Sequence, residues 1–284
     1  MTQESGISLR AGNLQLALRP DLGGCVAGLW HGGALVLRSV PAGTLAGVRQ
    51  GGGYPLLPYS NRLGHARFSF EGHHYTTEAN FGDSPHSVHG VGWQRPWSAQ
   101  VHTGHQAALR LVHEPDAHWP FAFEATQQFD LDPATLRVRL GITNTDARAQ
   151  PVGLGWHPYF PKRAGSHLRA EVDARWDVGA DELPVRRAHQ SGIDNDVAAL
   201  DFDHCFEGWR GVAHIDDGVF RLRLNADLTR LVVYTPPDRG YFCVEPVTHV
   251  NDAIHMDTPE SHGLVILQPG ERHEIAIGLE VCVA

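Results

Sequence analysis

The stretch His273-Glu274-Ile275-Ala276-Ile277-Gly278-Leu279-Glu280-Val281 alternates large apolar residues with polar or small ones. Successive side chains of a β-strand point to opposite faces, so a period of two predicts a strand with one buried face. Similar alternation recurs in short runs at residues 14–19, 68–70, 107–112, 136–140, 220–224 and 231–234. The pattern therefore predicts an all-β chain.

Turn-forming residues separate these runs. Glycine, proline, aspartate and asparagine interrupt them about every 8 to 12 residues, as between strands. With 31 glycines and 18 prolines, but no Gly/Ser-rich linker and no fixed repeat, we predict one domain over residues 1–284, built from stacked antiparallel sheets. Outside the strands we expect a flexible Gly51-Gly52-Gly53 loop and a long surface loop over about residues 178–197. Residues 248–256 form either a short helix or irregular chain.

Charge and cysteine content narrow the partners and the compartment. The formal net charge is −9 and the pI is about 6.1, so we expect neither nucleic acid nor a membrane as a partner. No apolar run reaches the roughly 18 residues that a spanning helix needs, and residues 1–5 lack the basic start of a signal peptide. The four cysteines form no C-x-x-C pair, which argues against a zinc ribbon. We expect a cytoplasmic protein with reduced cysteines.

An acidic residue interrupts one apolar strand pattern, Tyr241-Phe242-Cys243-Val244-Glu245-Pro246. Alternation places Phe242 and Val244 on one face and Cys243 and Glu245 on the other. A buried carboxylate without a partner is costly. Glu245 is therefore predicted to be hydrogen-bonded, paired or facing a wet cavity.

A histidine occupies a comparable position in Val152-Gly153-Leu154-Gly155-Trp156-His157-Pro158-Tyr159-Phe160. Leu154 and Trp156 fit a core face, whereas His157 shares the opposite face with two glycines, which have no side chain to fill space. We interpret this face as a ligand pocket flanked by one carboxylate and one imidazole. That combination indicates general acid–base chemistry.

Polar residues at five places carry a family resemblance. They lie in Asn61-Arg62-Leu63-Gly64, Val88-His89-Gly90, the His157 stretch, Asp203-His204-Cys205-Phe206 and Glu245-Pro246. With Leu18-Arg19-Pro20-Asp21-Leu22-Gly23-Gly24 near the start and Leu267-Gln268-Pro269-Gly270-Glu271 near the end, their order resembles the aldose 1-epimerase (galactose mutarotase) family over nearly the whole chain. One such motif is weakly specific, whereas five in family order are strongly specific.

The resemblance implies a β-supersandwich with an open sugar-binding groove, in which α and β anomers of free aldoses interconvert. It implies that Glu245 removes the proton of the C1 hydroxyl, that His157 protonates the ring oxygen, and that His89 hydrogen-bonds near that oxygen. The ring opens, the C1–C2 bond rotates, and reclosure gives the other anomer. Sugar hydroxyls would be held by three polar residues, Asn61, Arg62 and Asp203.

The chemistry of this reaction agrees with the residue types. Opening a hemiacetal ring requires one proton to be removed and one delivered, without a redox group, so we expect a sugar partner, no cofactor and no metal. With reference pKa values of about 4.3 and 6.5, an ionised glutamate and a protonated histidine coexist near neutral pH. Each positioned group is typically worth about 10² to 10⁴ in rate. We expect a monomer or a weak homodimer.

Simpler interpretations of the same residues stay open. Glu245 fits a carboxylate paired with an arginine at a sheet rim, and His157 fits a hydrogen-bonded core histidine. Arg62 fits a loop arginine bonded to backbone carbonyls. Two candidates also have rivals of the same type nearby: His86 for His89, and Asp201 for Asp203.

Other functions compete with the epimerase. A non-catalytic carbohydrate-binding β-sandwich would need neither acid nor base. A metal-dependent isomerase is suggested by His86-x-x-His89 and His102-x-x-His105, but a third or fourth ligand is not evident. A sugar-phosphate enzyme should show clustered cations, whereas Arg62, Arg67 and Arg95 are dispersed.

Departures from the family pattern leave the sugar open. His89-Gly90-Val91-Gly92-Trp93 lacks the doubled glycine common after the first histidine, and Phe160-Pro161-Lys162-Arg163 lacks the asparagine common after the aromatic pair. Galactose, glucose, arabinose and xylose all stay possible substrates. An apolar platform for the sugar is available from three aromatic candidates, Trp93, Tyr159 and Trp209.

Overall fold

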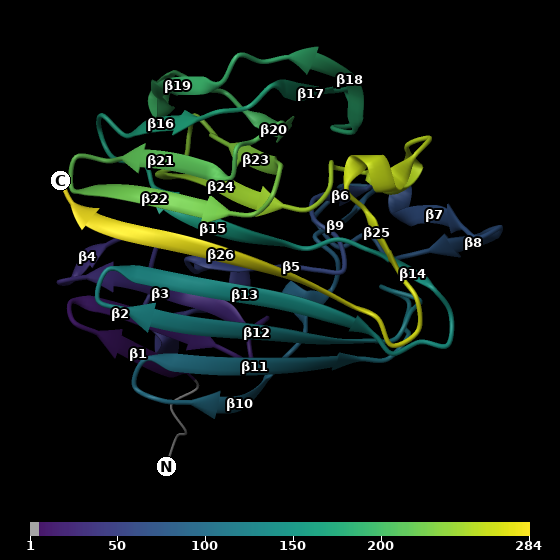
Figure 1. Cartoon of the computed structure of the whole chain (residues 1–284), viewed down its shortest axis with the longest axis horizontal. Coiled ribbons are helices and arrows are strands. Elements are labelled where there is room, and N and C mark those ends of the chain that lie inside the picture. Colours follow the sequence, from purple (N-terminus) through teal and green to yellow (C-terminus); the bar gives the residue numbers. More distant parts are fainter. Residues whose placement is uncertain (1–5) are drawn as a thin grey trace.

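Two large antiparallel sheets lie one behind the other in the structure, a computed structural model that describes residues 6–284 (Figure 1). The first sheet has 11 strands and the second has nine. All strand pairs within them are antiparallel, from β1–β2 to β16–β19. The all-β prediction is confirmed. Residues 1–5, on which the signal-peptide argument rests, lie outside the described part of the chain.

The strands of the first sheet, in spatial order, are β1 (Ile7–Ala11), β2 (Leu14–Arg19), β3 (Cys25–His31), β5 (Gly53–Leu56), β15 (Gly155–Pro161), β24 (Tyr241–Val247), β23 (Arg230–Tyr234), β20 (Asp203–Glu207), β17 (Ala174–Val178) and β18 (Pro184–His189), with β4 (Ala34–Leu35) paired to β3. Those of the second are β10 (Ser98–His102), β11 (Gln106–His113), β12 (Phe123–Asp132), β13 (Thr135–Asn144), β26 (Arg272–Val283), β22 (Phe220–Ala226), β21 (Val212–Asp216), β16 (His167–Ala170) and β19 (Ile193–Asp196).

Smaller elements complete the described chain. Three two-stranded sheets pair β14 (Gln150–Val152) with β25 (Val265–Leu267), β6 (Arg62–Leu63) with β9 (Ser87–Val88), and β7 (Arg67–Phe70) with β8 (His73–Thr76). The helices present over residues 6–284 are 3₁₀ turns: η1 (Ala42–Thr44), η2 (Val48–Gln50), η3 (Gly64–Ala66), η4 (Gly92–Gln94), η5 (Val197–Ala199), η6 (Ala253–His255) and η7 (Pro259–His262). None of them is long and apolar enough to cross a membrane.

The main core contains the apolar residues predicted by the period of two. In β26, Ile275, Ile277, Leu279 and Val281 are buried in it, whereas the intervening residues are more exposed. Because buried apolar area contributes roughly 25 cal/mol per Å², each such strand anchors the two layers. β24 contributes to the same core through its Phe242 and Val244 face.

The opposite face of the first sheet contains a second apolar cluster. Cys243 and Val247 of β24 belong to it, together with Tyr54 of β5 and Tyr159 of β15. η4 contributes Trp93, whose ring stacks on that of Tyr54 with centroids 5.7 Å apart. β24 is thus buried on both faces, and the functional candidates lie on this second face.

Two predictions about the irregular segments need correction, and one open alternative can now be described. Residues 178–197 contain the strands β18 and β19, so the predicted long loop is wrong. Gly51-Gly52-Gly53 is not a flexible loop, because it packs closely: a Cβ on Gly52 would lie 2.7 Å from the carbonyl oxygen of Arg38. Residues 248–256 contain only the 3₁₀ turn η6.

Candidate functional site

Strand register brings His157 and Glu245 together. In the antiparallel pair β15–β24, Gly155 lies opposite Val247 and Tyr159 lies opposite Cys243, so His157 and Glu245 occupy matching positions between them. The His157 Nε2 atom lies 3.4 Å from Glu245 Oε1. The two residues are only 6% and 2% exposed.

Burial opposes charge on both members of this pair. It raises the pKa of Glu245 well above its usual value, and the nearby Asp203 carboxylate adds to the shift. Burial also lowers the pKa of His157 well below its usual value, with smaller effects of His89 and Arg38. Both shifts oppose the ion pair that the reference pKa values predict. A neutral carboxylic acid beside a neutral imidazole holds the same single proton as the ion pair, so the two forms differ only in where that proton lies.

Each residue of the pair has one side-chain atom that lacks a hydrogen-bond partner within the described chain. Glu245 Oε2 and His157 Nδ1 are buried without a hydrogen bond. Buried polar atoms in native proteins are almost always hydrogen-bonded, so each exception calls for an explanation. A ligand that supplies hydroxyl groups would satisfy both atoms.

A cavity of about 320 Å³ lies in front of the pair. It is lined by all six predicted site residues, Asn61, Arg62, His89, His157, Asp203 and Glu245. The carboxylate of Asp203 is about one-third exposed at its mouth. This volume suits a small polar molecule better than a polymer.

His89 enters the cavity from the turn that follows β9. It adopts a left-handed backbone with φ of 65°, and its Nδ1 accepts a hydrogen bond from the Asn61 N–H at 3.0 Å. Its single proton therefore lies on Nε2, which leaves a neutral donor on the ring. Burial lowers the pKa of His89 to about 3, with contributions from Arg62 and Arg49.

The rival His86 lies behind the cavity wall. Its Nδ1 accepts a hydrogen bond from the His65 N–H at 2.9 Å, and its Nε2 lies 2.8 Å from the carbonyl oxygen of Asp181. Because both ring nitrogens are used and the ring does not line the cavity, His86 supports the rim. His89 is the histidine that faces the space.

Arg62 is held between three oxygen-bearing side chains. Asn61, itself left-handed with φ of 55°, accepts from the Arg62 Nη1 group at 3.2 Å. The Arg62 Nη2 group donates to Glu182 at 2.8 Å and to Asp203 at 3.3 Å. Asp201 precedes β20 and does not line the cavity, so Asp203 is the aspartate at the site.

Glu182 was not predicted from the sequence. It lies in the turn between β17 and β18, with a left-handed φ of 63°, and lines the cavity mouth. A charged residue in a polar segment gives no sequence signal. Only the pairing of β17 with β18 brings this turn over the site.

Aromatic rings form the cavity walls. Tyr54 lies with its ring centroid 4.6 Å from that of His157, and Tyr159 lies at the same separation on a stacked plane. Of the three predicted platform residues, Tyr159 lines the cavity. Trp93 lies behind Tyr54, and Trp209 is buried, donating to the carbonyl oxygen of Val212 at 2.9 Å. Tyr54 was missed because it follows a glycine run read as a loop.

The glycines beside His157 do not open the cavity. A Cβ on Gly153 would lie 1.9 Å from the His249 ring, and one on Gly155 would lie 2.8 Å from Val247. The missing side chains make room for these neighbours, so this part of the pocket prediction is wrong. His249 Nε2 accepts a hydrogen bond from the Ser60 N–H at 3.0 Å, and its Nδ1 lies 2.7 Å from the carbonyl oxygen of Val250. His249 thus fixes the backbone next to Asn61.

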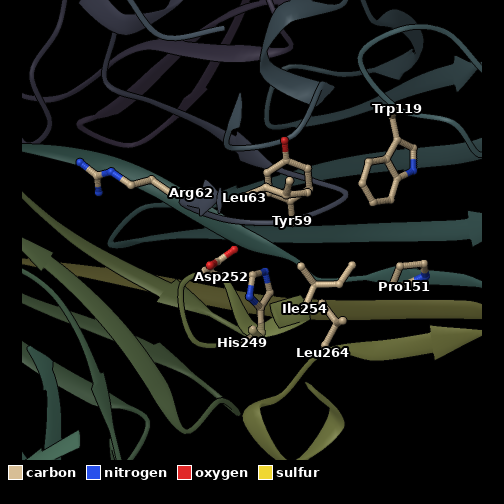
Figure 2. Close-up of a pocket in the computed structure, with 10 residues that line it drawn as sticks. Tyr59, Arg62, Leu63, Trp119, Pro151, His249, Asp252, Ile254 and Leu264 are labelled. Carbon is tan, nitrogen blue, oxygen red and sulfur yellow. The ribbon is translucent and has the colours of Figure 1, made fainter. Parts of the chain in front are cut away.

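A second, much smaller cavity is lined by His249, Asp252 and Arg62, with Trp119 and Ile254 farther along it (Figure 2). Its volume is about 20 Å³, which is room for about one water molecule. Arg62 lines both cavities. The larger cavity in front of His157 and Glu245 is therefore the candidate ligand site.

The described chain contains one group of three side chains that could hold a metal ion: His157, Cys243 and Glu245. The predicted metal-binding pair His86 and His89 does not share one site. His86 uses both ring nitrogens outside the cavity, whereas His89 lines the cavity. His102 is exposed on β10.

The fold and the site together define a β-sandwich protein with a buried histidine–glutamate pair at a small polar cavity. The family model for aldose 1-epimerase matches residues 5–280, and the chain belongs to that family. The chain is also 30% identical to the uncharacterised protein YphB of Escherichia coli strain K12, over 96% of this chain and 98% of that protein.

Solved structures agree with this assignment. A putative aldose 1-epimerase from Escherichia coli K12 superposes with a TM-score of 0.88 at 27% identity, covering 98% of this chain and 99% of the other. A galactose mutarotase-like protein from Clostridium acetobutylicum gives a TM-score of 0.84 at 19% identity, covering 98% and 95%. The second likeness concerns the fold alone, which is the galactose mutarotase-like β-sandwich.

Proposed function

We propose that this protein is a cofactor-independent aldose 1-epimerase that interconverts the α and β anomers of a free aldose. The observation that carries the proposal is the pairing of His157 with Glu245 on adjacent strands, facing a cavity and each with a buried atom that lacks a partner. The family membership supports the same reaction class. The proposal includes one domain, a cytoplasmic location and a monomer or weak homodimer, as predicted from the sequence.

The proton count of the pair suits ring opening. Glu245 takes the proton of the C1 hydroxyl and His157 delivers one to the ring oxygen, so the sugar opens to the aldehyde without a net gain or loss of protons. Sugar hydroxyls that bond to the unpartnered Glu245 Oε2 atom stabilise the carboxylate against burial. This favours the ion-pair form when substrate is bound. On reclosure the two groups exchange roles, which gives the other anomer.

The remaining polar residues position the sugar. His89 is a neutral donor through Nε2 because its Nδ1 accepts from Asn61, and it hydrogen-bonds near the ring oxygen. Arg62 and Asp203 bind sugar hydroxyls at the mouth, while Asn61 orients Arg62. Tyr159 supplies an apolar wall beside His157.

The charge of the cavity favours a neutral sugar. Three acidic side chains line it, those of Glu182, Asp203 and Glu245. Among the described residues, Arg62 is the arginine that lines it, and its guanidinium group already donates to Glu182 and Asp203. A phosphate group would meet acidic side chains rather than a free cation. The cavity therefore argues against sugar phosphates.

Anomer exchange on freshly dissolved α-galactose, α-glucose and arabinose, followed by polarimetry or NMR, tests the proposal. The wild type should accelerate exchange of at least one sugar with or without a chelator, and Glu245→Gln should lose about 10² to 10⁴ of that rate. Full activity in Glu245→Gln would overturn the assignment. If the protein binds sugar but leaves anomer exchange at its rate in buffer alone, it is instead a carbohydrate-binding protein.

A further inference from the structure

A buried thiol lies beside the proposed acid–base pair. Cys243 precedes Glu245 by two residues on β24 and so shares its face. Its backbone pairs with Tyr159, two residues from His157 on β15. One ligand atom from each of His157, Cys243 and Glu245 lies within 4.8 Å of the other two.

We propose that these three residues form a binding site for a thiophilic divalent cation, with Zn²⁺ as the type, and that the bound ion blocks the acid–base pair. Thiolate, imidazole and carboxylate are the three common zinc ligands. Metal–ligand bonds of about 2.0 to 2.3 Å place tetrahedral ligands roughly 3.3 to 3.8 Å apart. The 3.4 Å separation of His157 Nε2 and Glu245 Oε1 already meets that requirement.

The surroundings of the three residues favour a cation. Glu245 Oε2 has no competing hydrogen bond, and the carboxylates of Glu182 and Asp203 line the route through the cavity. Cys243 itself does not line the cavity, so the ion would lie between its thiol and the cavity-lining residues His157 and Glu245, with water as the fourth ligand. As the metal–sulfur bond forms, the thiol proton and the proton shared by Glu245 and His157 leave to solvent, and nothing is oxidised or reduced.

The arrangement indicates reversible rather than permanent binding. A metal-bound histidine normally donates its second ring nitrogen to a partner, and loss of that partner costs about 10- to 100-fold in affinity. One ring nitrogen of His157 has no such partner. Because the ion takes both His157 and Glu245, metal and sugar compete for one site. The competition rests on the proposed function, whereas the binding of the ion does not.

Titration with Co²⁺ tests the binding, because a thiolate ligand gives a charge-transfer band in the ultraviolet. The protein carries Cys282→Ser throughout, since that thiol is exposed. One ion per chain should bind with this band, and a chelator should remove it. Cys243→Ala and Cys243→Ser should both lose the band. The matched control is Cys205→Ala, another buried cysteine of the same sheet, which should keep it.

Inhibition by Zn²⁺ gives the second measurement. Zn²⁺ should inhibit anomer exchange competitively with sugar, and each Cys243 variant, compared with its own uninhibited rate, should need at least about tenfold more metal. A band that persists in both folded Cys243 variants, or no band in the wild type, would overturn the site. A band without any anomer exchange would leave the metal site standing and remove the proposed function. Exchange that proceeds unchanged in the presence of Zn²⁺ would leave the proposed function standing and overturn the claim that the ion blocks His157 and Glu245.

Discussion

Two neighbouring regions contain buried histidines, and they differ in how their polar atoms are satisfied. On the strand pair β15–β24, His157 and Glu245 face each other, and each has a buried atom without a partner. Around residues 59–66, by contrast, His249 and His86 each use both ring nitrogens on backbone groups. His157 and Glu245 face the cavity, whereas His249 and His86 hold the backbone beside it in place.

This difference separates stability from chemistry. A satisfied buried polar group fixes the backbone around it, whereas an unsatisfied one costs about 1–3 kcal/mol. Of the buried side-chain atoms without a hydrogen bond in the described chain, those of His157 and Glu245 belong to residues that line the candidate ligand cavity.

The sharpest test replaces one histidine of each region. His157→Gln should reduce anomer exchange by about 10² to 10⁴, because the proposed function makes His157 the group that protonates the ring oxygen. His249→Gln should reduce exchange by less than about tenfold while lowering the free energy of unfolding by about 1 kcal/mol, because a backbone hydrogen bond is lost. Exchange rates and urea unfolding of both variants check this. Equal loss of exchange in the two variants would erase the distinction.

Close packing of His249 against Gly153 predicts a destabilisation that a second change removes. A Cβ on Gly153 would lie 1.9 Å from the His249 ring, so Gly153→Ala should cost about 1–3 kcal/mol. In a His249→Ala background the ring is absent and most of that cost should disappear. A double-mutant cycle of unfolding free energies measures the coupling. Strictly additive costs would show that the ring is not the obstacle.

Glu245 should lower stability at neutral pH. Its pKa is raised in the folded protein by burial, so the folded state binds more protons than the unfolded state above pH of about 4.5. The contribution of Glu245 to wild-type stability therefore falls, by at most about 1.4 kcal/mol per pH unit, as pH rises from there to the folded pKa. Glu245→Gln removes this loss. It should be more stable than wild type at pH 8 and lose that advantage at pH 4, in urea unfolding at both values.

The smallest effect distinguishes two aspartates at the cavity mouth. Asp203 lines the cavity and bonds to Arg62, so Asp203→Asn should raise KM about fivefold, the loss of about one hydrogen bond. Asp201→Asn should leave KM unchanged, because Asp201 lies outside the cavity lining. Initial rates over a range of sugar concentrations give both values. A larger change in Asp201→Asn would reverse the assignment.

Strand patterns predicted from the sequence fared best where one face is buried. β26 shows its alternation because one set of its side chains enters the core. β18 and β19 were missed because both faces of these edge strands are largely exposed. Their few apolar residues, Val185, Ala188 and Ile193, do not alternate with polar ones, so no period of two is visible.

Several residues that line the candidate site were predicted from the sequence, but the residues that hold them in place were not. Glu245 and His157 stand out because polar residues interrupt apolar strands. Glu182 and His249 carry no such signal, since their positions depend on which turns and strands meet in space. The role of Gly153 also depends on a ring from the far end of the chain. Their interaction is invisible before the fold is known.

The cavity joins strands that are neighbours in the sheet but distant in the chain. β5, β15 and β24 run side by side and contribute Tyr54, His157 and Glu245 respectively. Pairing of distant segments is slow, because the intervening chain must first be ordered. A folding intermediate in which β24 has not yet docked on β15 lacks the cavity in which we propose that sugar binds. Recovery of sugar binding during refolding should therefore lag behind the recovery of strand content.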